Sequence, residues 1–143
     1  MSIVNIRDTG RNSAKVGDVR ELATKVQKPS DTEAITAANT ITAAESGTRF
    51  VMNTATARIQ TLPSPAAGLE YWFYVGATEP TGTHTIVTAS SANIIVGNVS
   101  SPEDAAGNVA TVTDADTISL VASKAVHGDF VHVWSDGTNW YLD

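Results

Sequence analysis

The chain has 143 residues, of which 42% are hydrophobic and 17% are charged, with a formal net charge of −6 and no cysteine. This length fits one domain with a hydrophobic core, and the lack of cysteine excludes disulfides, thiolate catalysis and cysteine-ligated zinc. No apolar run approaches the roughly 18 residues that a membrane-spanning helix needs, and the N-terminus lacks the apolar stretch of a signal peptide. We therefore expect assembly inside a cell and no membrane partner.

The charges are distributed unevenly along the chain. Residues 1–28 hold six basic and three acidic residues, a net charge of +3. Residues 59–143 hold Lys124 as their one basic residue against nine acidic ones, a net charge of −8. A basic segment before an acidic body suggests an arm that is attracted to a negative surface. We do not expect the body to bind nucleic acid, because phosphate contacts need clustered Lys and Arg.

Residues 1–33 are predicted to form an N-terminal arm. Residues 1–17 are typical of an extended, irregular segment with one apolar patch at residues 3–6. Asp18 and Glu21 have the spacing of a capping box, so a short helix is expected that ends before Pro29. The apolar residues of this helix fall on one face: Val19, Leu22, Ala23 and Val26. About nine residues are too few for a stable isolated helix, so this helix needs a surface to pack against.

Residues 34–143 are predicted to form the body, an all-β domain of antiparallel sandwich or barrel type, jelly-roll-like. Val, Ile, Thr and aromatic residues dominate it, and turn residues recur every 8–12 positions. Asp136-Gly137 predicts a hairpin, because Asp-Gly adopts positive φ at little cost. No sequence repeat indicates a solenoid. Strands are expected near Ile35–Ala43, Arg49–Asn53, Ala57–Leu62, Tyr71–Gly76, His84–Ala89, Ala92–Val96, Val109–Thr113, Thr117–Ala122, Phe130–Ser135 and Asn139–Leu142.

One predicted strand places aromatic rings on both of its faces, because side chains alternate along a strand. These residues are Tyr71, Trp72, Phe73 and Tyr74. A strand of a monomeric two-sheet domain usually has one polar face, so two aromatic faces indicate burial on both sides. One explanation is a central strand that lies under a long loop. The other is a subunit interface formed by these four residues, since aromatic residues are enriched in interface cores.

The sequence contains no recognisable catalytic pattern, so we expect no enzyme activity and no cofactor. There is no nucleophile elbow, P-loop or glycine-rich dinucleotide motif. His127 and His132 match no zinc spacing, and we expect no metal site. Asp114 and Asp116 are expected at turns, where Asp is favoured. Calcium ligation and glycoside hydrolysis by these carboxylates are the alternatives considered.

The C-terminal aromatic residues offer a further candidate for binding. Trp134 and Trp140 flank the predicted Asp136-Gly137 hairpin, and Tyr141 follows directly. Cross-strand contacts beside the hairpin are the expected role of these rings. A platform on which a sugar stacks is the alternative.

Two stretches together resemble a recurrent pattern of phage virion proteins and cover roughly residues 44–143. In the first, a strand that ends in Leu62-Pro63-Ser64-Pro65 and is followed by Gly68 leads into the aromatic strand at residues 71–75. The second is the closing segment of residues 128–141, with the pattern GD-x-V-x-x-x-SDG-x-x-W-Y. The resemblance is to capsid decoration (cement) proteins of tailed bacteriophages and to modules in phage tail fibres.

The resemblance implies a structural virion protein that binds the outer surface of a phage capsid, cross-links major capsid subunits and is commonly a homotrimer. The implied partners are the major capsid protein and other copies of the chain, with assembly in the host cytoplasm. The alternative is a tail-fibre or receptor-binding β module that contacts a cell-surface glycan. The expected capsid-binding arm residues are Ile3, Val4, Ile6, Arg7, Arg11, Lys15, Arg20, Leu22, Lys25 and Val26.

Overall fold

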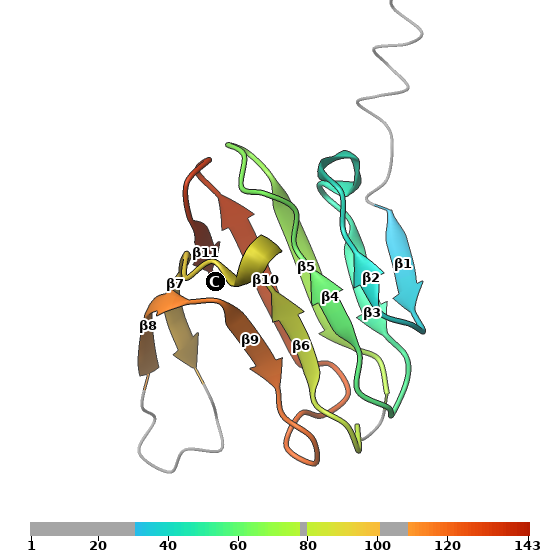
Figure 1. The fold of residues 1–143 in the computed structure, drawn as a ribbon. Coiled ribbons are helices and arrows are strands. Elements are labelled where there is room, and N and C mark those ends of the chain that lie inside the picture. Colours follow the sequence, from blue (N-terminus) through green and yellow to red (C-terminus); the bar gives the residue numbers. More distant parts are fainter. Residues whose placement is uncertain (1–30, 78–79, 101–108) are drawn as a thin grey trace, which may run out of the picture. The chain divides into compact units, whose positions relative to one another are not determined.

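A computed structural model describes residues 31–77, 80–100 and 109–143 of the chain (Figure 1). The chain divides into two units, residues 1–30 and residues 31–143. The predicted arm helix and all ten expected arm residues lie outside the described residues. Strand β1 begins at Thr32, so the body starts slightly earlier than residue 34.

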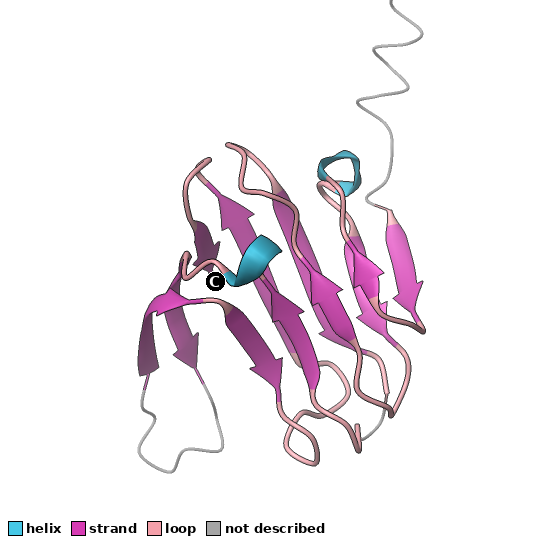
Figure 2. Cartoon of the chain, viewed as in Figure 1, coloured by secondary structure: helices cyan, strands magenta, loops and turns pink. Residues whose placement is uncertain are grey.

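The described residues form a mostly β structure with two mixed sheets, joined by turns and two one-turn 3-10 helices (Figure 2). Among these residues, no helix has the length and apolar character needed to cross a membrane. The seven-stranded sheet has the order β1 (Thr32–Ile35), β3 (Arg49–Met52), β5 (Glu70–Val75), β10 (Phe130–Ser135), β11 (Trp140–Leu142), β7 (Ile95–Ser100) and β8 (Val109–Ala115). The four-stranded sheet has the order β2 (Asn39–Thr40), β4 (Ile59–Thr61), β6 (His84–Val87) and β9 (Thr117–Leu120).

The first six strands alternate between the two sheets, as can be followed in Figure 1. Strands β1, β3 and β5 are parallel neighbours in one sheet, and β2, β4 and β6 are parallel neighbours in the other. Strands β9 and β10 then add antiparallel to β6 and β5. The expectation of an antiparallel domain is therefore wrong for this half of the body. Hydrophobic alternation reports which face of a strand is buried, but it carries no information on the direction of the neighbouring strand.

The strand expected at Ile35–Ala43 is in fact two strands, β1 and β2, in different sheets. Ile35 and Ile41 are both buried, but the chain crosses between the sheets at residues 36–38. The turn that follows is closed locally: the backbone N–H and the hydroxyl of Thr42 donate to the carboxylate of Glu45 at 2.7 and 2.6 Å. Ile35 and Ile41 have the even spacing that is expected within one strand, but a crossover between the sheets separates them.

The predicted hairpin at Asp136-Gly137 is confirmed, because it joins the antiparallel strands β10 and β11. The Asp136 carboxylate accepts the backbone N–H groups of Thr138 and Asn139, both at 2.8 Å. Gly137 has a φ of 104°, which a residue with a side chain rarely adopts. The remaining predicted strands coincide with or overlap observed ones.

The buried sides of both sheets contribute to one hydrophobic core. Phe50 and Phe73 stack with ring centroids 5.4 Å apart, and Tyr71 packs against Trp140 at 5.8 Å. The hydroxyl of Tyr71 donates to the carbonyl oxygen of Thr42 at 2.9 Å, and burial, with a smaller effect from Glu45, raises the pKa of Tyr71 to about 12. Each fully buried large apolar side chain stabilises the fold by roughly 1.5–3 kcal/mol. Burial of one face of a strand fixes which residues lie on its other face, because side chains alternate along the strand.

Candidate functional site

The outer side of the seven-stranded sheet carries a contiguous group of aromatic side chains, which we call the aromatic face. It consists of Trp72 and Tyr74 of β5, Phe130, His132 and Trp134 of β10, and Tyr141 of β11. Alternation along each strand explains its position, because the intervening residues of the same strands point into the core. The most exposed rings are those of Phe130, at 59%, and Trp134, at 37%.

The sheet register places these rings opposite one another in three stacked pairs. Trp72 lies opposite His132, Tyr74 opposite Phe130, and Trp134 opposite Tyr141. The centroid distances are 4.4 Å for Trp72–His132, 5.5 Å for Tyr74–Phe130 and 4.4 Å for Trp134–Tyr141, with interplanar angles of 8°, 25° and 17°. Cross-strand aromatic pairs of this kind stabilise a sheet by about 0.2–1 kcal/mol each.

Charged groups surround the Trp72–His132 pair. The guanidinium carbon of Arg49 lies 5.5 Å from the centroid of the Trp72 ring, in position for a cation–π interaction. The imidazole of His132 has Glu70 Oε2 at 3.6 Å from Nε2 and Asp143 Oδ2 at 3.5 Å from Nδ1. Basic Arg49 thus lies on the β3 side of the aromatic face, and the acidic residues are Glu70 at the start of β5 and Asp143 directly after β11.

A second polar group lies at the hairpin end of the aromatic face. The Tyr141 hydroxyl donates to Asp136 Oδ2 at 2.9 Å. The backbone N–H groups of Asn139 and Thr138, and then this hydroxyl, lower the pKa of Asp136. The carboxylate therefore stays charged at neutral pH and holds the Tyr141 ring in place beside Trp134.

Stacking covers part of the ring surface on the aromatic face. The face of Trp72 next to His132 is covered by that ring, and Arg49 lies over Trp72 as well. Trp134 and Tyr141 each cover one face of the other. Sugars stack on open ring faces, whereas a row of partly exposed rings with mixed charges at its margin has the composition of a protein interface.

The structure separates the four residues of the expected subunit interface. Tyr71 and Phe73 are fully buried in the core of this chain, so their rings are inaccessible to a second subunit. Trp72 and Tyr74 lie on the aromatic face and remain candidates. Strand β5 is central in its sheet, between β3 and β10. The two-sided aromatic pattern therefore arises from a core on one side and the aromatic face on the other.

The proposed sugar platform is divided in the same way. Trp140 is buried in the core, whereas Trp134 and Tyr141 lie on the aromatic face. Four further residues of this site, Phe130, His132, Arg49 and Glu70, were not predicted from the sequence. The alternation of Phe130, His132 and Trp134 along one strand was the available signal, but pairing with β5 depends on a non-local register.

The other chemical candidates stay apart from one another. Within the described residues, no three metal-ligating side chains come together. His84 is buried with Nε2 3.0 Å from the carbonyl oxygen of Thr54, and His127 Nδ1 lies 2.9 Å from that of Gly76. Asp116 lies in the bend between β8 and β9, as expected, whereas Asp114 lies within β8 and not at a turn. Asp114 has a φ of 58°, in the left-handed region that Asp tolerates.

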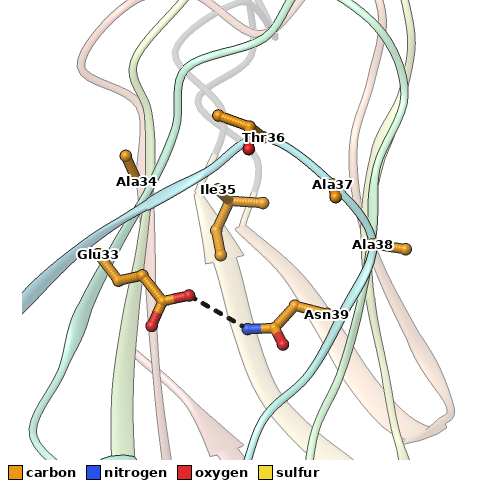
Figure 3. A pocket seen from close by; sticks show the side chains of 7 residues that line it. All are labelled: Glu33, Ala34, Ile35, Thr36, Ala37, Ala38 and Asn39. Atoms are coloured by element: carbon orange, nitrogen blue, oxygen red, sulfur yellow. Dashed lines mark hydrogen bonds between the residues drawn. The ribbon is translucent and has the colours of Figure 1, made fainter.

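A small cavity of about 180 Å³ lies within the β1–β2 connection, lined by residues 33–39 (Figure 3). Glu33 and Asn39 point toward each other across it, with Asn39 Nδ2 donating to Glu33 Oε1 at 3.5 Å. Burial, and then the nearby Glu45 carboxylate, raise the pKa of Glu33. The two polar groups interact with each other, and the other side chains that line the cavity carry no chemistry beyond one hydroxyl.

Comparison with known proteins gives no relative: no family model, no curated protein and no solved structure matches this chain. The described body is mostly β, with two mixed sheets, one shared core and the aromatic face.

Proposed function

We propose that the chain is a structural virion protein that binds the outer surface of a phage capsid and stabilises it by cross-linking major capsid subunits. The body would be a β-sandwich, in which the two sheets that share the core pack face to face. The aromatic face is the observation that carries this proposal, because it offers stacked rings with basic and acidic residues at its margin. The resemblance of residues 44–143 to decoration proteins supplies the identity of the assembly.

The distribution of charged and aromatic residues supports two partners. The basic arm of residues 1–28 contacts the major capsid protein, with its Lys and Arg residues setting orientation and rate more than affinity. The aromatic face contacts a second copy of the chain within a homotrimer. Its charges suit this contact, since Arg49 of one copy is complementary in charge to Asp143 and Glu70 of the next. Weak contacts repeated in a trimer gain strength through effective concentration.

The alternative function is a tail-fibre or receptor-binding module that contacts a cell-surface glycan. The exposed Trp134 next to Tyr141 is the observation in its favour. It is weaker support, because the two rings cover each other and leave little open ring surface.

Copy number in purified particles tests the proposed function directly. We expect hundreds of copies per particle for a capsid protein, whereas a few tens or fewer would contradict the proposal and favour the tail. Capsids stripped of the protein should also regain heat resistance when the full chain is added back, and the chain without residues 1–28 should fail to attach.

Mutation of the aromatic face tests its role in self-association. The double variant Tyr74→Ser and Phe130→Ser removes one stacked pair from the surface, and we expect at least a tenfold weaker trimer by light scattering. Ile59→Ser is the matched control, because Ile59 is 52% exposed on the other sheet. A double variant that remains as trimeric as the control, or a wild-type chain that is monomeric both in solution and on particles, would refute this interface.

A further inference from the structure

A second surface lies between the edge of the four-stranded sheet and the seven-stranded sheet, directly beside the core. It is a groove with a volume of about 690 Å³, within the range of roughly 300–1,000 Å³ that is usual for binding sites. Its floor contains Ile118 and Leu120 of β9, Val131 of β10 and Leu142 of β11. Its margin has the exposed side chains Val99, Val121, Val126 and Phe130, with exposures of 41%, 50%, 50% and 59%. Phe130 also belongs to the aromatic face, so the two surfaces meet at this residue. Four of the six exposed large hydrophobic residues of the described chain thus gather around one groove.

The strand beside this groove has an open edge. Within the described residues, β9 pairs with β6 and with no other strand. The backbone N–H of Thr88 donates to the carbonyl oxygen of Asp116 at 2.9 Å. In an antiparallel pair, every second residue is hydrogen-bonded to the neighbouring strand, so this bond shows which residues of β9 are bonded to β6. Ile118 and Leu120 therefore direct their backbone groups to β6, and Thr117 and Ser119 direct theirs to the open side. Such an edge is a template for another strand.

Charge limits the kind of strand that fits. Asp129 and Asp143 line the groove, and Asp143 also faces His132. Asp116 lies directly before β9. Lys124 is the one basic residue among the lining residues, and it is the one basic residue in the sequence from 59 to 143. An incoming segment with basic residues would complement this margin, and an acidic one would be repelled.

We propose that this groove binds an extended, basic peptide segment of a partner protein, which adds to the sheet as a strand beside β9. Main-chain hydrogen bonds to Thr117 and Ser119 would provide affinity, as in other cases of strand addition. Alternate apolar side chains of the peptide would enter the groove against Ile118 and Leu120, and its basic side chains would face the acidic margin. The groove and its chemistry do not depend on the proposed function. The proposed function supplies only the source of the segment, which is the major capsid protein.

Binding of a synthetic probe to the full chain tests the groove. The probe is a nine-residue peptide of alternating Lys and Val, blocked at both ends, and the comparison peptide replaces each Lys by Glu. Calorimetry should detect the Lys peptide with at least tenfold higher affinity, and amide signals of β9 should shift on binding. Equal affinity for the two peptides, or no binding of the Lys peptide, would overturn the proposal.

Two substitutions at Ser119 separate backbone pairing from side-chain contact. Ser119→Pro removes an outward N–H without removing a bond to β6, so we expect at least tenfold weaker peptide binding. Ser119→Ala keeps the N–H and should bind like the wild type. Should the proline variant prove unfolded by its thermal transition, Val121→Ser at the margin replaces it, with a several-fold loss expected. Unchanged binding by a folded Ser119→Pro variant would refute strand addition.

The same variants distinguish this inference from the proposed function. Binding of Ser119→Pro to stripped capsids should fall together with its binding of the peptide. If capsid attachment is normal while peptide binding is lost, the capsid protein is overturned as the source of the segment, and the virion function stands. If the wild-type chain binds the peptide but is absent from capsids, the virion function fails and the groove stands.

Discussion

Among individual residues, His84 and His132 show how the surroundings of one side chain decide its chemistry. His84 is fully buried, with Nε2 near the Thr54 carbonyl and with Nδ1 lacking a partner among the described residues. Burial is the main cause that lowers the pKa of His84, and Arg58 acts in the same direction. His132 lies instead between two carboxylates on the outer side of the sheet.

The lowered pKa of His84 predicts how stability depends on pH. Below about pH 6.5, the unfolded chain binds a proton at this histidine that the folded chain resists. The melting temperature should therefore fall as the pH decreases from 7 to 5. His84→Gln, whose amide can still donate to Thr54, should reduce this slope in calorimetry, and His127→Gln should retain it. A slope that His84→Gln leaves unchanged would show that another group is responsible.

Phe73 and Phe130 form a matched pair on neighbouring strands. Phe73 is fully buried and Phe130 is 59% exposed. We expect Phe73→Ala to lower the free energy of unfolding by about 3–5 kcal/mol, because it leaves a cavity in the core. Phe130→Ala should cost about 1 kcal/mol, the value of its stacking with Tyr74. Urea unfolding measures both, and similar losses would contradict the assignment of Phe130 to the surface.

Among the strands, positions were predictable, but the parallel pairing within β1 to β6 was not. Alternating apolar residues located the strands near Arg49, Tyr71 and Phe130 to within a residue or two, because burial of one face imposes a period of two. Which strands become neighbours depends on where the chain crosses between the sheets. The crossover at residues 36–38 is short and carries no distinctive residue.

The same limit applies to the candidate site. The sequence of residues 71–75 predicts aromatic rings on both faces of one strand, and the structure confirms this. The partners of Trp72 and Tyr74 come from β10, more than 50 residues later in the chain. Local pattern cannot supply that register, so the arrangement of the aromatic face and of the groove required the structure.

The pairing of β7 with β11 depends on a glycine. Gly97 has a φ of 144°, and a Cβ there would lie 2.8 Å from the Leu142 carbonyl oxygen and 2.9 Å from Leu142 Cβ. Gly97→Ala should therefore destabilise the fold by more than the roughly 1–2 kcal/mol of backbone strain alone. Gly128→Ala is the control, since Gly128 has a φ of 98° with open space around it. Chemical denaturation should rank Gly97→Ala as clearly worse, and equal losses would argue against the close approach.

In the whole molecule, the described core is formed entirely by residues from Ile35 to Leu142. We therefore expect the chain without residues 1–28 to fold with a cooperative thermal transition, within a few degrees of the full chain. Calorimetry and near-UV circular dichroism measure this. Aggregation of the truncated chain, or loss of its transition, would indicate that the arm completes the body, and would count against its role as a docking segment.

The alternation of β1 to β6 between the two sheets has a consequence for the rate of folding. In this half of the body no strand pairs with the next one along the chain; Thr32 pairs with Arg49, and Arg49 with Trp72. Each pairing closes a long loop before any hydrogen bond forms, which is typical of proteins that fold in milliseconds to seconds. The β10–β11 hairpin closes the shortest loop between paired strands, so substitutions there should slow folding, whereas substitutions in β1 should mainly accelerate unfolding. Stopped-flow kinetics would show whether assembly proceeds in this order, from the C-terminal hairpin back towards the start of the body.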